Sequence, residues 1–220
     1  MSLGVLFDID GTLVSFEFDV QGSRLALFAE LTKLGFDTGG LSPTSPTQHV
    51  IDYAQGQISA GAVNASFGAV RKRLFAILDE FELRSSPKVT VLPGVYDALE
   101  SLRRKHVKLA VLTNSGRRAA ADVLRRGSLL GYFDFVLTRD DVDSMKPSPS
   151  GVKKALSTFA LRKEQVFYVG DSVFDIMAAK AAGLEVISVA TGHYTVERLK
   201  GEGADVVISS LKELEAALPL

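Results

Sequence analysis

The sequence of 220 residues contains no cysteine, which excludes disulfide bonds and thiolate metal sites. Its formal net charge is -1 and it has no long basic block, so neither nucleic acid nor an anionic membrane is indicated as a partner. No apolar run approaches the length of a membrane span, and the first residues lack the regions of a signal peptide. We therefore expect a cytoplasmic protein, either a monomer or a homodimer, that binds neither nucleic acid nor membrane.

Hydrophobic residues make up 46% of the chain, which is enough to fill a core. This composition indicates a folded protein rather than a disordered one. The length allows either one domain or one domain together with a second, smaller domain.

The stretch that organises the rest is LGVLFDIDGTLV, residues 3–14. A short apolar run that ends in turn residues predicts a buried strand. Asp8 and Asp10 are two residues apart, so on an extended chain their carboxylates point to the same side. Like charges this close are costly unless a cation or a shared proton offsets them, and Mg2+ prefers oxygen ligands. From this stretch alone, a metal-binding strand end and a solvated acidic turn both remain open.

Residues 15–86 show helical spacing of apolar residues and no convincing strand. Helices are predicted over residues 20–34, 47–58 and 62–81, and Ser85-Ser86-Pro87 predicts a hinge out of this segment. We therefore expect an all-helical domain over residues 15–86, inserted into a larger domain that comprises residues 1–14 and 87–220.

After residue 92 the pattern alternates between helices and apolar strands. Strands are predicted over residues 107–112, 133–137, 165–169, 185–189 and 205–208, with helices between them. This alternation predicts an α/β fold, a doubly wound parallel sheet covered by helices on both faces. Binding sites in such sheets lie at the carboxyl ends of the strands.

Polar residues follow four of these expected strand ends. Taken singly, each has an ordinary structural explanation, as a helix cap, a solvated lysine or a favourable charge in a first helical turn. Together they supply carboxylates for a metal, hydroxyl and amide donors, and one cation, which are the parts needed to hold and cleave a phosphate ester. The set is Asp8 with Asp10, Thr113 with Asn114 and Ser115, Lys146 with Pro147, and Asp171 with Asp175.

These segments resemble, in order and spacing, the four motifs of the haloacid dehalogenase-like (HAD) hydrolase superfamily. The segments are DIDGTL at residues 8–13, TNS at 113–115, Lys146-Pro147 and GDSVFD at 170–175. The helical insertion resembles the cap domain of the phosphoglycolate phosphatase-like and β-phosphoglucomutase-like branch, and the α/β part resembles its Rossmann-like core. Asp10 is typical of the hydrolases and absent from the dehalogenases, so dehalogenation is not expected.

The resemblance implies a phosphatase that acts on a small-molecule phosphate monoester, with phosphoglycolate as the reference substrate and Mg2+ as the cofactor. Asp8 would be the nucleophile that forms an aspartyl-phosphate, and Asp10 the general acid and base. The metal would be held by Asp8, Asp171 and the backbone carbonyl of Asp10. Asp175 would bind it through water or orient Lys146.

The same resemblance assigns the remaining site residues. The Thr113 hydroxyl and the Asn114 amide would hold phosphate oxygens, and Lys146 would balance the charge on the nucleophile and the phosphoryl group. The helical cap would close the site and select the substrate. Arg24, His49 and Arg71 are the candidate cap contacts.

Three alternatives remain beside this interpretation. One is a phosphomutase of the β-phosphoglucomutase type, which would return the phosphoryl group to a sugar. Another is a receiver-like signalling module in which Asp8 is merely phosphorylated, although the motif order and the helical insertion argue against it. The third is a catalytically silent binding protein with the HAD fold, against which the intact motif set argues.

Overall fold

The computed structural model describes residues 2–15 and 17–220 and divides the chain into two compact units. One unit comprises Met1–Phe16 and Ser86–Leu220, and the other comprises Glu17–Ser85.

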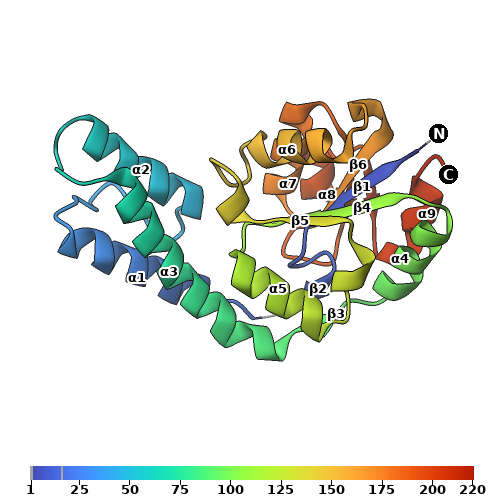
Figure 1. Cartoon of the computed structure of the whole chain (residues 1–220), viewed down its shortest axis with the longest axis horizontal. Helices are drawn as coiled ribbons and strands as arrows, with labels where there is room; N and C mark the ends of the chain where they lie inside the picture. Colours follow the sequence, from blue (N-terminus) through green and yellow to red (C-terminus); the bar gives the residue numbers. More distant parts are fainter. Residues whose placement is uncertain (1, 16) are drawn as a thin grey trace. The chain divides into compact units, whose positions relative to one another are not determined.

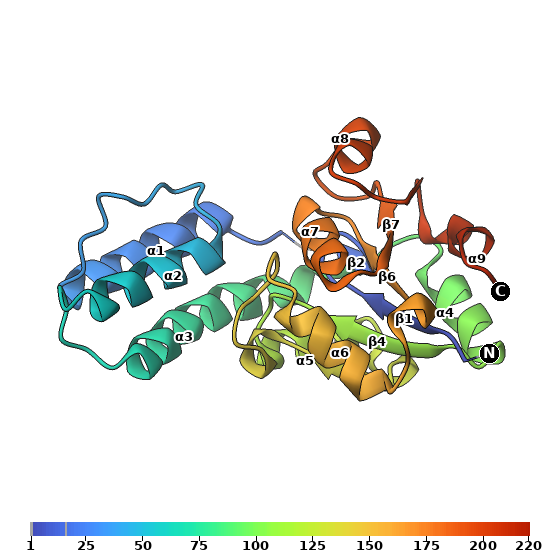
Figure 2. The same ribbon diagram turned by 90° about the horizontal axis from the view of Figure 1, so that it is seen from above.

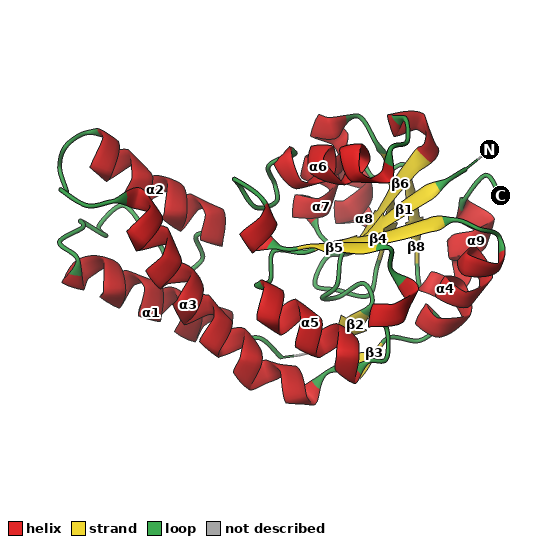
Figure 3. Cartoon of the chain, viewed as in Figure 1, coloured by secondary structure: helices red, strands yellow, loops and turns green. Residues whose placement is uncertain are grey.

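The larger unit holds a parallel sheet, drawn in yellow in Figure 3. Its described strands follow the order β5-β4-β1-β6-β7-β8. The strands are β1 (Gly4–Phe7), β4 (Lys108–Leu112), β5 (Phe135–Leu137), β6 (Val166–Gly170), β7 (Glu185–Val189) and β8 (Val206–Ile208). β1 pairs with β4 on one side and with β6 on the other, so the strand order reverses at β1. The carboxyl end of β1 therefore lies between those of β4 and β6, where doubly wound folds place their sites.

Helices cover both faces of this sheet (Figure 1). Two hydrophobic clusters of buried side chains show the two layers, because one contains residues of α4, α5 and α9 and the other contains residues of α6, α7 and α8. The bounds are α4 (Val95–Arg104), α5 (Arg117–Arg126), α6 (Ser150–Phe159), α7 (Val173–Ala182), α8 (Val196–Gly201) and α9 (Leu214–Ala217). The predicted α/β fold class is confirmed.

One small element was absent from the sequence prediction. Val14–Ser15 (β2) pairs antiparallel with Thr90–Val91 (β3). The chain leaves β1 at Phe7 and turns at Gly11, whose φ of +78° is the left-handed region that favours glycine. Two-residue strands have no readable periodicity, so this pairing depends on the tertiary structure.

The smaller unit contains three helices among its described residues, α1 (Val20–Lys33), α2 (Thr47–Ser59) and α3 (Phe67–Ser85) (Figure 2). The predicted helices over 20–34 and 47–58 agree closely with α1 and α2. The third helix begins and ends later than the predicted range of 62–81. A turn at Gly61, whose φ is +73°, occupies the start of that range. Apolar side chains of all three helices are buried, among them Leu27, Val50 and Leu74.

None of the described helices has both the length and the apolar composition that crossing a bilayer requires.

Candidate active site

The predicted site residues of the larger unit come together because their strands are neighbours. Asp8 follows β1 directly, and its backbone N–H donates to the carbonyl of Val169 in β6 at 2.9 Å. Thr113 follows β4, and its N–H donates to Leu137 in β5 at 3.0 Å. The ladder of the sheet thus continues one residue into each motif, which fixes the motif backbones against one another.

Lys146 lies at the centre of the site, although it belongs to a loop. Its side chain is buried, and its Nζ donates to Asp8 Oδ1 at 2.6 Å and to Asp175 Oδ1 at 2.7 Å. A third bond reaches the carbonyl of Leu112 at the end of β4, at 3.2 Å. All three donors of the ammonium group are therefore used, and its position is fixed from three separate segments.

Asp175 is the acceptor that holds this lysine. Besides Lys146, its Oδ1 accepts from the Tyr168 hydroxyl at 2.9 Å, while Oδ2 accepts from Ser172 N at 3.1 Å and from Ser172 Oγ at 2.6 Å. A carboxylate has about four acceptor positions, and these bonds occupy them. This geometry favours the orienting role for Asp175 over direct metal coordination.

Asp8, Asp171 and Asp175 form a buried carboxylate cluster, in which one oxygen of each lies within 4.8 Å of the others. The Thr12 hydroxyl is 3.5 Å from Asp171 Oδ1, a long contact. Two glycines leave room for Asp171, because a Cβ would lie 2.3 Å from its Oδ2 at Gly11 and 1.8 Å at Gly192. Hard oxygen donors held this close fit Mg2+, with Asp8 and Asp171 as the carboxylates whose oxygens are less engaged.

The protonation of the cluster reflects its burial. Desolvation raises the pKa of Asp8 to about 6, with Asp175 acting in the same direction and Lys146 opposing it. Desolvation also raises the pKa of Asp171 to about 8, reinforced by the charges of Asp175 and Asp8. Burial alone would lower the pKa of Lys146, but Asp175 and Asp8 raise it well above its ordinary value. Lys146 is thus charged, but it is a single cation among the three carboxylates of the cluster. A second cation would stabilise their ionised forms.

Asp10 differs from Asp8 in its surroundings. Its side chain is exposed, whereas that of Asp8 is buried, and its carboxylate is not among those of the cluster. Its backbone forms an isolated bridge with Val14, which places it in the turn after β1. An exposed carboxylate next to a buried one provides two different environments for two chemical roles.

The second motif supplies one hydroxyl and one amide. Thr113 is buried, and its Oγ1 accepts from Ser115 N at 3.1 Å, which leaves the hydroxyl proton to donate. The Asn114 amide spans the Lys146 backbone, since Oδ1 accepts from Lys146 N at 2.9 Å and Nδ2 donates to Lys146 O at 3.1 Å. Its carbonyl oxygen and one N–H are therefore engaged, and only one amide hydrogen remains for a phosphate.

Sequence reasoning missed Tyr168, because a tyrosine inside an apolar strand gives no signal of its bond to Asp175. The turn at residues 191–195 follows the end of β7, and from the sequence we expect it to touch the substrate or the cap. In the structure the Thr191 hydroxyl donates to the carbonyl of Gly11 at 2.5 Å, and Gly192 lies against Asp171. This turn therefore forms part of the wall around the carboxylates.

The candidate cap contacts belong to the helical unit. Arg24 is buried in it, and its Nε donates to the carbonyl of Ser45 at 2.8 Å. Arg71 lies over the ring of Phe75 at 4.8 Å, and His49 is exposed. Their roles toward a substrate remain predictions.

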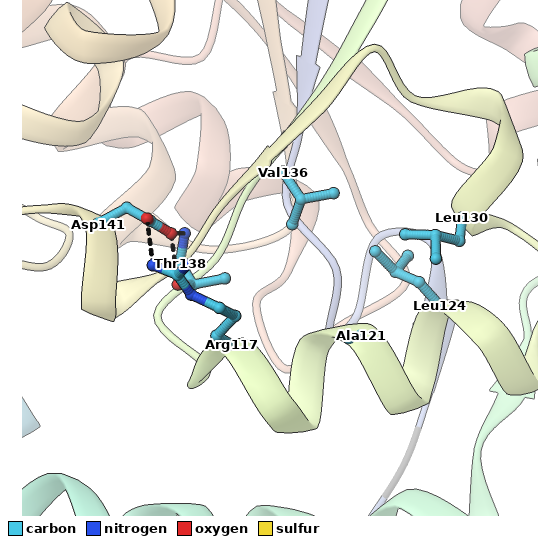
Figure 4. A pocket seen from close by; sticks show the side chains of 7 residues that line it. All are labelled: Arg117, Ala121, Leu124, Leu130, Val136, Thr138 and Asp141. Carbon is cyan, nitrogen blue, oxygen red and sulfur yellow. Dashed lines mark hydrogen bonds and ion pairs between the residues drawn. The ribbon is translucent and has the colours of Figure 1, made fainter.

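A separate cavity of about 120 Å³ opens beside α5 (Figure 4). Its apolar lining includes Leu124, Leu130 and Val136, and its polar end is closed by side chains that bind one another. There Arg117 donates to Asp141 Oδ1 at 2.6 Å and the Thr138 hydroxyl donates to Asp141 Oδ2 at 2.7 Å. These pairs hold a turn and offer no arrangement for catalysis.

The chain is similar in sequence to proteins named as phosphatases and in fold to a solved structure. A phosphoglycolate phosphatase of Pseudomonas putida is 27% identical over 216 residues, which cover 96% of this chain and 77% of that protein. "Probable phosphatase IndB" of Dickeya dadantii is 30% identical over 214 residues, which cover 97% of this chain and 92% of that protein. CbbY of Rhodobacter sphaeroides, solved in complex with phosphate, has the same fold, with a TM-score of 0.66, 24% identity and 100% of both chains covered.

The sequence profile of the haloacid dehalogenase-like hydrolases matches residues 5–189. This range contains all four motifs and the helical insertion. The resemblance predicted from the motifs is therefore confirmed, and the chain belongs to the haloacid dehalogenase-like hydrolase family.

Proposed function

We propose that this protein is a Mg2+-dependent phosphatase that hydrolyses a small-molecule phosphate monoester through an aspartyl-phosphate on Asp8. The observation that carries the proposal is the placement of Lys146 between Asp8 and Asp175, beside the carboxylate of Asp171. The names of the two relatives, both phosphatases, support the same reaction class.

Asp8 suits the role of nucleophile. Lys146 bonds to its Oδ1, which leaves Oδ2 to attack phosphorus. The cation also lowers the repulsion between the carboxylate and an approaching dianionic phosphate. The Thr113 hydroxyl, held by Ser115 N, would donate to a phosphate oxygen and orient the ester for attack.

Asp10 suits the proton transfers. Its exposed side chain lies two residues beyond the nucleophile, so it can protonate the leaving alcohol and later deprotonate water. Asp8 cannot act as both the nucleophile and the general base, because its carboxylate is bonded to phosphorus after the first step.

The donor set fits a divalent ion. Asp8 and Asp171 would hold Mg2+, with the backbone carbonyl of Asp10 as a further donor, while Asp175 keeps Lys146 in place. When bound, the ion would neutralise the clustered carboxylates and stabilise the charge of the transferring group.

Phosphoglycolate is the first substrate to test, because relatives with that activity in their names match the chain over most of its length. Residues 15–86 would act as the cap domain that closes the site and sets the choice of ester, and we place the enzyme in the cytoplasm. Hydrolysis rather than phosphoryl return to a sugar is proposed because relatives that match the chain over most of its length carry phosphatase names.

The test is a screen of the purified full chain against small phosphate esters with Mg2+, measured as released inorganic phosphate. The panel includes phosphoglycolate, p-nitrophenyl phosphate and sugar phosphates, and the matched control is Asp8→Asn. Release that disappears in the control supports the proposal. A wild-type protein that releases no phosphate from any ester contradicts it, and sugar-phosphate conversion without phosphate release favours the mutase.

A further inference from the structure

Arg139 is a fully buried arginine in a short 3-10 turn, Arg139–Asp141, that follows β5. It belongs to none of the four motifs. Burying a guanidinium carries a large desolvation cost, and an apolar residue of similar volume often serves stability as well or better. We therefore looked to the contacts of Arg139 for a role other than stabilising the fold.

Those contacts lead to the second motif. Arg139 Nη1 donates to the carbonyl of Asn114 at 3.2 Å, and the Arg139 backbone N–H donates to the carbonyl of Ser115 at 3.2 Å. Two consecutive carbonyls of the 113–116 loop are thus fixed by one residue.

From Asn114 the chain of contacts continues to the catalytic lysine. The Asn114 amide bonds the Lys146 backbone on both sides, at 2.9 and 3.1 Å, and Lys146 Nζ then reaches Asp8 at 2.6 Å. A displacement of about 1 Å in such a group can cost on the order of a hundredfold in rate.

The turn that carries Arg139 is itself held in place. Thr138 caps it, with its N–H and hydroxyl on Asp141 Oδ2 at 3.0 and 2.7 Å. Arg117 secures it from α5, with its backbone N–H on Asp140 Oδ2 at 2.8 Å and its guanidinium on Asp141 (Figure 4). Arg139 thus approaches Asn114 from a fixed support.

We propose that Arg139 is a positioning residue for Lys146 and acts through Asn114. This inference rests on the proposed phosphatase function and deepens it. It also assigns Asn114 primarily to the lysine loop, in place of the direct phosphate contact expected from the sequence.

The experiment compares Arg139→Met with the wild type, using p-nitrophenyl phosphate and Mg2+. We expect kcat to fall by about 10–100-fold with a smaller change in KM, because the lysine is misplaced while the ester still binds. Arg117→Met is the matched control, since it loosens the same turn without touching Asn114, and it should retain most of its activity. Equal losses in both variants would show that only the turn's stability matters, and would overturn the proposal.

A double-mutant cycle separates positioning from general structural damage. If Arg139 acts through Lys146, the Arg139→Met and Lys146→Met double variant should be no slower than Lys146→Met alone, within about twofold. Additive losses would overturn the proposal. Should Arg139→Met fail to fold, Asn114→Asp tests the next link, because it loses the donor to Lys146 O; an unchanged kcat there would equally overturn it.

A crystal structure of Arg139→Met gives a readout that does not depend on turnover. We expect the Asn114 amide to leave the Lys146 backbone and the Lys146–Asp8 contact to lengthen. An unchanged contact refutes the inference even if the wild type proves to have no phosphatase activity. If the wild type has no phosphatase activity but Arg139→Met shows the displaced Asn114 and Lys146, only the proposed function is refuted.

Discussion

Lys146 Nζ lies 2.6 Å from Asp8 Oδ1, although 138 residues separate them in the chain. The same ammonium group bonds Asp175 at 2.7 Å, and all three residues are buried. In this low-dielectric site the cation holds the proposed nucleophile in one orientation and offsets part of its charge.

Removing the cation should damage turnover severely. Lys146→Met should lower kcat/KM by on the order of 10²–10³, because charge that develops on the transferring group loses a fixed donor. Lys146→Arg should not restore activity, since the rigid guanidinium fork cannot replace three bonds from one ammonium group. Lys108→Met, which removes a lysine bonded to the carbonyl of Phe159, is the matched control and should remain active. Near-normal turnover of Lys146→Met would contradict the role.

The two motif aspartates should behave differently. Asp8→Asn should abolish turnover of every ester, because no covalent intermediate forms. Asp10→Asn should retain a first turnover of p-nitrophenyl phosphate, whose leaving group needs little protonation, and then slow by about 10²–10⁴-fold as water loses its base. Rapid-mix kinetics should show a burst of nitrophenolate, with 32P label retained on the protein. A burst in Asp8→Asn and none in Asp10→Asn would reverse the assignment.

Activity should require a divalent ion. Excess EDTA should remove hydrolysis of p-nitrophenyl phosphate, and added Mg2+ should restore it, because Asp8 and Asp171 need a second cation besides Lys146. The measurement is the initial rate before and after the addition. Undiminished activity in EDTA would exclude the metal assignment.

The metal-free protein should lose stability as pH rises from about 4 to about 8. In the folded state burial raises the pKa of Asp171 to about 8, above its ordinary value of 3.8. The folded state therefore binds more protons than the unfolded state in this window, and its stability decreases with pH. Asp171→Asn should remove part of this decrease and raise Tm at pH 8.5 but not at pH 4.

Thermal unfolding in EDTA measures this effect, since about 1 kcal/mol moves the Tm of a chain of this size by roughly 2–4 °C. Added Mg2+ should raise the Tm of the wild type at pH 8.5 and have less effect on Asp171→Asn. If Asp171→Asn is less stable than the wild type at pH 8.5 without metal, the ionised Asp171 carboxylate does not destabilise the folded protein.

A side chain at Gly192 should disturb Asp171. A Cβ there would lie 1.8 Å from Asp171 Oδ2, so either the turn or the carboxylate must move. Gly192→Ala should lower the apparent affinity for Mg2+ in activity titrations by about tenfold or more, because a ligand carboxylate loses its orientation. Gly201→Ala is the matched control, because its Cβ would meet no atom within 4 Å. Equal metal affinities in both variants would show that the turn at residue 192 yields without moving Asp171.

The sequence by itself determined the α/β class, the positions of most helices and strands, and the motif residues of the candidate site. Periodicity identifies an amphipathic helix or a buried strand because burial follows the geometry of each element. Asp8, Thr113 and Asp171 could be predicted to meet because they follow strands of a parallel sheet, whose carboxyl ends share one edge.

Only the tertiary structure decided which of these residues bond one another. Whether Asn114 contacts a phosphate or the Lys146 backbone depends on where two loops, 32 residues apart, come to lie. Tyr168 and Arg139 gave no signal, since a tyrosine in an apolar strand and an arginine in a turn are usually explained by local structure. Tyr168 bonds a residue seven positions later in the chain, and Arg139 bonds one 25 positions earlier. Such bonds depend on sub-ångström geometry that no local pattern of residue types encodes.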